Sequence, residues 1–149
     1  QWSDDQTGLR CKARLDWIIP GVAVVDLKST RNGDALAFGR AAHGYLMHAQ
    51  MAYYQQGYSA CADELLPVRI IAVEKEPPYG VGVYNLEREA LNLGRRDYIR
   101  LLQLYLQCQE CGQWPAYPVD IRPLNLPAWA LRTPTAFPPP ACTVSSSRT

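Results

Sequence analysis

Three side chains in the N-terminal part of the chain have the types and the spacing to carry out hydrolysis: Asp16, Asp26 and Lys28. Carboxylates hold hard divalent cations, and a bound cation lowers the pKa of a water ligand. A lysine beside that cation adds positive charge where the transition state develops negative charge. The chemistry that this set predicts is metal-dependent hydrolysis of a phosphodiester bond.

The element that must hold Asp26 and Lys28 is a strand. Residues 22–25 form a Val/Ala run, which is typical of a strand covered on both faces. Residues two apart on a strand point to the same face, so the acid and the lysine share one. The Leu27 carbonyl at the strand end is a further candidate oxygen ligand. An ordinary ion pair at a strand end explains this spacing equally well, so the spacing leaves both interpretations open.

A preceding strand must bring Asp16 to the same place. Residues 10–19 alternate between two kinds of side chain with a period of two, which favours a strand. Pro20 and Gly21 then mark a turn, so residues 10–28 are predicted to form a hairpin. Asp16 would lie on one strand of this hairpin and Asp26 on the other.

The remaining elements follow from periodicity and from cap signals. We expect a helix over residues 35–56, strands over 67–74 and 81–84, and a second helix over 86–110. Asp34 and Asn85 are the expected N-caps, and Gly57 and Gly112 the expected helix ends. The order β-β-α-β-β-α predicts an α/β fold with a mixed central β-sheet flanked by helices.

The C-terminal part changes character. Residues 114–129 are rich in proline and aromatic residues and are expected to dock as an irregular segment of the folded domain. Residues 133–149 are rich in Pro, Ser and Thr and too poor in apolar residues to fold, so we expect a disordered tail. The predicted organisation is one domain over residues 1–132 followed by that tail.

Bulk composition excludes some classes of protein. The 149 residues have a net charge of +1, so the overall charge does not indicate binding of nucleic acid. A local positive groove is still compatible with this net charge. No apolar run reaches the roughly 18 residues of a membrane helix. The five cysteines lack a disulfide framework, which favours a reduced, cytoplasmic protein. Cys108 and Cys111 form a lone CxxC, which is weak evidence for a metal site.

A polar pair on the first predicted helix could contact a substrate. Gln50 and Tyr54 are four residues apart and therefore share a helix face. Their amide and phenol groups suit phosphate oxygens or a sugar edge. A solvated helix face with a half-buried tyrosine is the alternative interpretation.

Residues 11–18, 25–30 and 48–54 together resemble, in order and spacing, the PD-(D/E)xK nuclease superfamily. More narrowly, they resemble its phage and prophage exodeoxyribonuclease VIII (RecE-like) branch. Residues 114–130 are similar to the C-terminal end of that domain, and the resemblance covers about residues 7–132. It implies a restriction-endonuclease-like core.

The resemblance also implies roles for particular residues. It makes Asp16 and Asp26 the metal-binding acids, with the Leu27 carbonyl as a further ligand and Lys28 as the catalytic lysine. It makes Gln50 and Tyr54 contacts to DNA, and we add Arg14 and His48 from the same blocks as further candidate DNA contacts. The implied cofactor is Mg²⁺, with Mn²⁺ as an alternative.

The implied activity is Mg²⁺-dependent degradation of linear double-stranded DNA, 5′ to 3′, in phage-type recombination. The implied setting is the cytoplasm of a bacterial or phage-infected cell. The implied partners are duplex DNA ends, further copies forming a homo-oligomeric ring, and a single-strand-annealing recombinase. The family carries an upstream helix with a glutamate and a histidine, so we expect this chain to be truncated at its N-terminus. Two alternatives stay open: an inactive remnant that binds DNA or a partner, and an endonuclease of the same superfamily.

Overall fold

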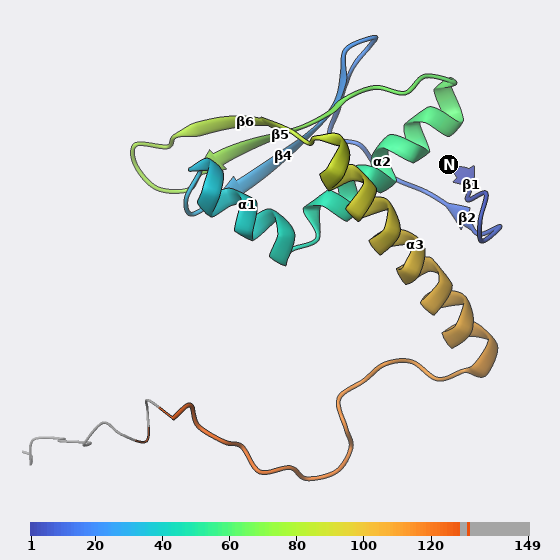
Figure 1. Ribbon diagram of the computed structural model, residues 1–149, viewed down its shortest axis with the longest axis vertical. Coiled ribbons are helices and arrows are strands. Elements are labelled where there is room, and N and C mark those ends of the chain that lie inside the picture. The colour runs from blue at the N-terminus through green and yellow to red at the C-terminus, as the bar shows by residue number, and fades with distance from the viewer. Residues whose placement is uncertain (129–130, 132–149) are drawn as a thin grey trace, which may run out of the picture. The chain divides into compact units, whose positions relative to one another are not determined.

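The computed structural model describes residues 1–128 and 131. It divides into two compact units, Gln1–Trp114 and Pro115–Thr149. The elements of the first unit, in chain order, are β1 (Trp2–Ser3), β2 (Arg10–Cys11), β3 (Trp17–Ile19), β4 (Ala23–Thr30), α1 (Ala35–Gly44), α2 (Met47–Ala62), β5 (Val68–Glu74), β6 (Val81–Asn85) and α3 (Arg88–Cys111) (Figure 1). In the second unit, no described residue belongs to a helix or strand.

The main sheet has four strands in the order β3-β4-β5-β6, and β1 and β2 form a separate two-stranded ribbon. The central strands β4 and β5 are parallel, joined by the crossover through α1 and α2, while the outer pairs are antiparallel. The register pairs Asp26 with Ile70 and Lys28 with Ala72. The prediction of an α/β fold with a mixed central sheet flanked by helices is confirmed.

The hydrophobic core forms where α1 and α2 pack on one face of the sheet (Figure 1). Its buried members are Val24, Phe38, Met51, Leu66, Val68, Ile70 and Ala72. A second cluster joins α2 to α3 through Ala49, Ala52 and Tyr98. Since strand residues alternate between faces, Asp26 and Lys28 lie on the same side of β4 as Val24. The candidate site therefore points toward the helices.

The opposite face of β4 is only partly covered. Residues 23–26 are all buried, as a strand covered on both faces requires, but the Leu27 side chain is 58% exposed. The prediction from the Val/Ala run is confirmed for residues 23–25, whereas Val22 is exposed and precedes β4.

The single helix predicted over residues 35–56 is wrong, because the chain forms two helices. Asp34 is the N-cap of α1, as predicted, and its carboxylate accepts hydrogen bonds from the backbone of the first turn. The break lies at Leu46, which adopts a left-handed conformation with φ of 54°. Gly57 does not end α2, which continues to Ala62. A Cβ at Gly57 would meet the ring of Trp2 at 2.5 Å, so that glycine serves close packing.

The predicted hairpin over residues 10–28 is shorter than expected. Residues 12–16 are irregular, and the hairpin consists of β3 and β4 alone. Asp16 therefore precedes the strand. Residues 2–3 pair with β2. At α3, Glu87 takes the N-cap position predicted for Asn85, and Gly112 ends the helix as predicted.

Three other predictions concern the C-terminal tail, membrane helices and the cysteine pair. The predicted disordered tail, residues 133–149, lies outside the described residues, so the boundary at residue 132 stays a prediction. Within the part of the chain that is described, no helix is long and apolar enough to cross a bilayer. Cys108 is buried and Cys111 exposed near the end of α3, and both are free thiols.

Candidate active site

Asp26 and Lys28 meet at the middle of β4. The Lys28 Nζ lies 2.6 Å from Asp26 Oδ2. The Asp26 side chain is 2% exposed and that of Lys28 is 23% exposed, so the pair lies at the boundary between core and solvent. The pair is predicted by the two-residue spacing, because both side chains leave the same face of the strand.

The burial of Asp26 has an electrostatic consequence. Desolvation by burial raises the pKa of this carboxyl above its ordinary value, and the nearby Asp16 carboxylate raises it further. Lys28 opposes both effects and lowers the pKa of Asp26, because its positively charged ammonium group lies close to the carboxylate. The net shift of the pKa is upward, so one lysine does not fully compensate the buried negative charge. A further cation would stabilise the ionised form.

Asp16 reaches the site from the segment before β3. Its Oδ2 accepts a hydrogen bond of 3.0 Å from the backbone nitrogen of Leu27, the residue between Asp26 and Lys28. In a strand, the N–H and C=O of one residue point to the same edge. The Leu27 carbonyl therefore also faces the edge where Asp16 lies. The structure brings together the three residues that sequence spacing singled out.

The donor set fits a hard divalent cation with open coordination positions. Asp26 Oδ2 is buried and, although Lys28 is close, has no hydrogen-bond partner of acceptable geometry. Within the described residues no group of three or more His, Cys, Asp or Glu side chains is placed to hold a metal. Two carboxylates still suffice for Mg²⁺, which is commonly bound by one or two carboxylates, waters and substrate phosphates.

Gln50 and Tyr54 are brought together on α2. The Gln50 Nε2 donates a hydrogen bond of 2.9 Å to the Tyr54 hydroxyl. The Tyr54 ring packs against the core cluster that contains Val24 of β4, so the pair lies on the helical side of the sheet that Asp26 also faces. The predicted shared helix face is confirmed, while its contact with DNA stays a prediction.

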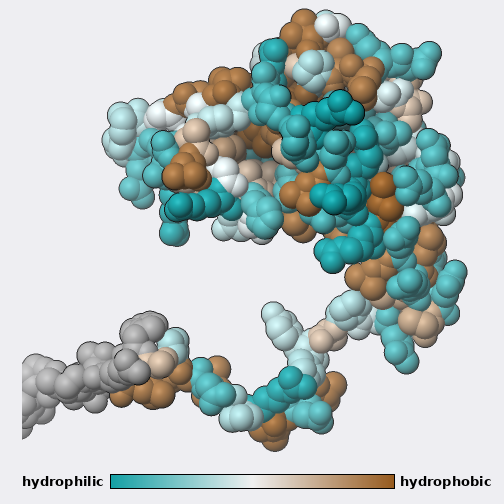
Figure 2. Space-filling view, viewed as in Figure 1, coloured by the Kyte–Doolittle hydropathy of each residue, from teal (hydrophilic) through white to brown (hydrophobic). Residues whose placement is uncertain are grey.

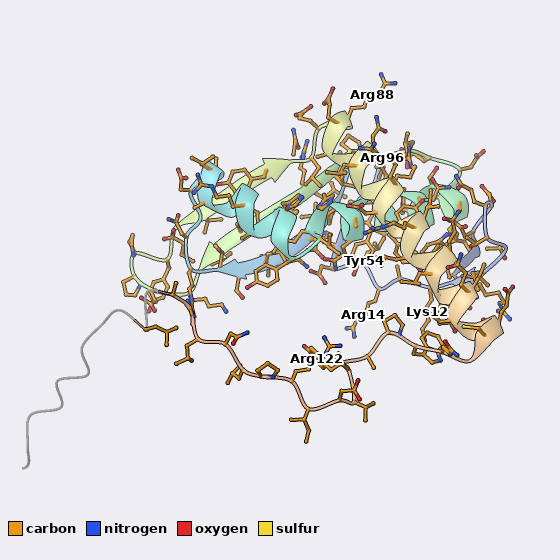
Figure 3. All side chains as sticks on the ribbon, turned by 60° about the horizontal axis from the view of Figure 1, so that its bottom comes forward. Lys12, Arg14, Tyr54, Arg88, Arg96 and Arg122 are labelled. Carbon is orange, nitrogen blue, oxygen red and sulfur yellow. The ribbon has the colours of Figure 1, made fainter. Side chains whose placement is uncertain are left out.

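Arg14 lies on the irregular segment that leads into Asp16. It is exposed, and its neighbours Ala13 and Leu15 line a hollow together with Tyr54. Figure 3 shows the side chains of Lys12 and Arg14 on the side of the ribbon where Tyr54 is labelled. The backbone carbonyl of Lys12 accepts a hydrogen bond of 3.3 Å from the Tyr53 hydroxyl, which fixes this segment to α2.

His48 is placed differently from the other candidate residues. It is buried, and its Nε2 lies 2.9 Å from Asp97 Oδ2 on α3. Its ring also stacks on that of His43, with centroids 5.5 Å apart. No contact among the described residues joins His48 to the two acids. Its geometry serves the packing of α2 against α3, and its predicted contact with DNA stays a prediction.

Sequence reasoning missed one residue that supports the site. Glu74 ends β5, and its Oε1 accepts a hydrogen bond of 2.7 Å from the backbone nitrogen of Gly33. Thr30, at the end of β4, pairs with Glu74 in the parallel ladder. Glu74 therefore fixes the loop that follows the strand carrying Asp26 and Lys28. An acid ending an apolar strand was the available signal, because a polar residue there needs a partner.

The mixed sheet, the helical crossover and the paired acid and lysine on a central strand define a nuclease-type fold of the PD-(D/E)xK class. Residues 1–121 match the family described as "PDDEXK-like domain of unknown function (DUF3799)", and the chain belongs to this family.

The fold is also that of a solved protein. A crystal structure from Eubacterium rectale, described as that of a candidate exonuclease, superposes with a TM-score of 0.63 at 22% sequence identity. The match covers 84% of this chain and 55% of the other, so this chain spans little more than half the length of that protein. No curated protein matches this sequence.

Proposed function

We propose that the protein is a Mg²⁺-dependent exodeoxyribonuclease that hydrolyses linear double-stranded DNA, with 5′ to 3′ polarity. The observation that carries the proposal is the buried Asp26 beside Lys28. Asp16 accepts a hydrogen bond from the backbone of Leu27, the residue between them. The family and the fold support a nuclease-type hydrolase in general. The polarity, a ring-shaped oligomer, a single-strand-annealing partner and a role in phage-type recombination rest on the RecE-like resemblance of the motifs.

Each residue of the site would have its own role in hydrolysis. Asp16, Asp26 and the Leu27 carbonyl would hold Mg²⁺ (or Mn²⁺), which supplies an activated water and charge stabilisation when bound. Lys28 places an ammonium group where negative charge develops on the phosphate. Gln50 and Tyr54 offer an amide and a phenol to the phosphate oxygens. Arg14 would contact the backbone of the bound strand.

The test uses linear duplex DNA labelled at either the 5′ or the 3′ end, with and without Mg²⁺. Wild-type protein is expected to release mononucleotides from the 5′ end and to leave covalently closed circles intact. Asp26→Asn and Lys28→Met should slow release by about 10²-fold or more. Glu110→Gln, which changes an exposed acid near the end of α3, should leave the rate unchanged. Wild-type rates in both site variants would show the assignment to be wrong.

A second candidate function is binding of DNA without cleavage. The observation that favours it is the two-carboxylate set, since no third acid, histidine or cysteine joins Asp16 and Asp26 within the described residues. Calorimetric titration with Mg²⁺ separates the two candidates: no metal binding and no cleavage, together with retained binding of duplex DNA, would establish the non-cleaving role. Cleavage of covalently closed circles would instead establish an endonuclease.

A further inference from the structure

The outer surface of α3 carries a row of cationic and amide side chains that the candidate active site does not use. Arg88, Asn92, Arg96 and Arg100 recur at every fourth residue and are all exposed. Side chains at this spacing form one ridge along a helix, here about 18 Å long at about 1.5 Å per residue. In Figure 2, hydrophilic side chains gather over the course that α3 takes in Figure 1.

This ridge borders an open hollow with a volume of about 630 Å³. The polar residues that line it are Gln6, Asn92, Arg95, Arg96, Arg100 and Gln103. Gln6 comes from the turn between β1 and β2, so two separate segments of the chain build the hollow. The lining includes three arginines and three amides and no acid. We call the ridge and the hollow together the α3 arginine face.

The positive charge of this face is not neutralised by neighbouring acids. Within residues 1–128 and 131, the side-chain ion pairs are Lys28–Asp26 and His48–Asp97, and neither involves an arginine of α3. The carboxylate of Asp4, which precedes the turn that holds Gln6, accepts a hydrogen bond of 2.6 Å from the Thr7 hydroxyl and forms no ion pair. No arginine of this face is therefore held in an ion pair with an acid among the described residues.

One of these arginines has an unmet hydrogen-bond donor. The Nε of Arg95 is buried and has no hydrogen-bond partner. A buried donor without an acceptor costs free energy, and Arg95 is also one of the residues that line the hollow. The guanidinium fork is also the side-chain group that best matches the paired oxygens of a phosphate.

We propose that the α3 arginine face binds the phosphate backbone of DNA at a distance from the active site. The inference rests on the proposed function in taking DNA as the polymer. A single small anion needs converging donors, whereas a ridge of about 18 Å matches a polymer that carries one charge per roughly 1.7 Å of duplex axis. The interleaved amides suit sugar and phosphate oxygens of nucleic acid.

The position of the face assigns it a role in holding substrate rather than in chemistry. Figure 3 shows Arg88 and Arg96 on one side of the ribbon and Lys12 and Arg14 on the other. A duplex contacting the α3 arginine face would be retained between cleavage events without touching Asp26 or Lys28. Loss of the face should therefore weaken binding and leave the chemical step unchanged.

The test measures binding without cleavage. Fluorescence anisotropy with a linear duplex of about 40 base pairs, in EDTA and across a range of NaCl concentrations, gives both affinity and salt dependence. For Arg96→Gln/Arg100→Gln we expect binding about tenfold weaker or more, and a salt slope smaller by about 1.8. The control, Arg10→Gln/Arg40→Gln, removes two exposed arginines elsewhere in the unit and should keep both values. Equal affinity and slope in both double variants would overturn the proposal.

Two further arms identify the ligand and separate this proposal from the proposed function. Vesicles of phosphatidylserine and phosphatidylcholine replace DNA in the first: loss of vesicle binding with unchanged DNA binding in Arg96→Gln/Arg100→Gln would overturn the assignment to DNA. The second adds Mg²⁺, where KM should rise at unchanged kcat. If wild-type protein binds DNA through this face but cleaves nothing, the proposed DNA-binding role of the face is supported and the proposed nuclease activity is overturned. If it cleaves while the double variant binds as wild type does, the nuclease activity is supported and the role of the face is overturned.

Discussion

Asp16 Oδ2 lies 3.0 Å from the backbone nitrogen of Leu27 and accepts its hydrogen bond. This contact ties the segment before β3 to β4, one residue from both Asp26 and Lys28. Asp16 thus has a structural role and an electrostatic role, because it fixes the edge of β4 and adds negative charge beside Asp26. The two roles can be separated by substitution.

We expect Asp16→Asn to reduce DNA cleavage by about 10²–10³-fold, the range for removing one electrostatic contribution to a transition state. The fold should survive, because the amide oxygen of asparagine still accepts the Leu27 hydrogen bond. The measurement is the initial rate of nucleotide release with Mg²⁺. Asp16→Ala, the control, loses the acceptor as well and should also melt at a lower temperature. A wild-type rate for Asp16→Asn would remove this acid from the site.

The buried Asp26 should make the protein less stable at neutral pH than an asparagine would. Burial raises the pKa of this carboxyl above its ordinary value of 3.8. Between 3.8 and the raised value, the folded state keeps a proton that the unfolded state has lost. The free energy of unfolding therefore falls as the pH rises through this window, and it stays lowered above it.

Thermal unfolding of wild type and Asp26→Asn across this window tests the sign. Asp26→Asn should melt at the higher temperature at neutral pH, and the difference should vanish below the ordinary pKa, where both side chains are neutral. Asp5→Asn, at an exposed acid, is the control and should show no such pH-dependent gain. A lower melting temperature for Asp26→Asn at neutral pH would contradict the assignment of burial as the dominant effect.

Replacing Lys28 should separate catalysis from DNA binding. Lys28→Met removes the ammonium group and should slow cleavage by about 10²–10³-fold, the range for removing one electrostatic contribution to a transition state. Lys28→Arg should not restore the rate, because a planar guanidinium does not reproduce a compact ammonium. Binding of duplex DNA in EDTA, measured by anisotropy, should change little in either variant. Rescue by arginine would show that positive charge alone is needed.

Loss of Lys28 should also change the titration of Asp26. Lys28 lowers the pKa of Asp26 against the effect of burial, so Lys28→Met should raise that pKa further. Carboxyl chemical shifts followed by NMR across acidic pH give the value directly. An unchanged pKa would show that the ion pair does not form in solution.

Much of this site was predictable from sequence because it depends on strand periodicity. The pairing of Asp26 with Lys28 needs only that residues two apart share a face. The position of Asp16 beside Asp26 was predicted, but from a different local structure than the one observed. A regular strand over residues 10–19 was expected, whereas an irregular segment places the acid, and its hydrogen bond to Leu27 is a tertiary contact.

The break between α1 and α2 was not predictable from local signals. Residues 35–56 are favourable for a helix, and a left-handed leucine at position 46 has no sequence signature. At Gly57 a local signal was present but misleading. The glycine suggests a helix end, but it is required by close contact with Trp2. Close packing between distant segments, which periodicity does not reveal, explains the glycine at position 57.

The hydrogen bond between Gln50 and Tyr54 should couple the two side chains in function. Gln50→Ala and Tyr54→Phe each remove it, at a cost of about 0.5–1.5 kcal/mol in the free energy of unfolding. If both side chains act on DNA as one unit, the double variant should lose no more affinity than the worse single variant. A double-mutant cycle of duplex affinity in EDTA measures this. Strict additivity would show that they act separately.

Gly94 should be intolerant of even one methyl group. A Cβ built at this position of α3 would lie 2.2 Å from the backbone carbonyl oxygen of His48 on α2. Backbone cannot yield as a flexible side chain does, so Gly94→Ala must push the two helices apart. We expect a loss of about 1–3 kcal/mol in the free energy of unfolding, the usual cost of overpacking, measured by urea denaturation. The His48–Asp97 contact should weaken with it.

Gly39 provides the matched control, because it also lies inside a helix but has nothing within 4 Å of a built Cβ. Gly39→Ala should gain about 0.5–1 kcal/mol from the lower conformational entropy of the unfolded chain. Gly94→Ala makes the same gain, so the difference between the variants isolates the close approach of α2 and α3. Equal stability of the two variants would mean that these helices are not in backbone contact at Gly94.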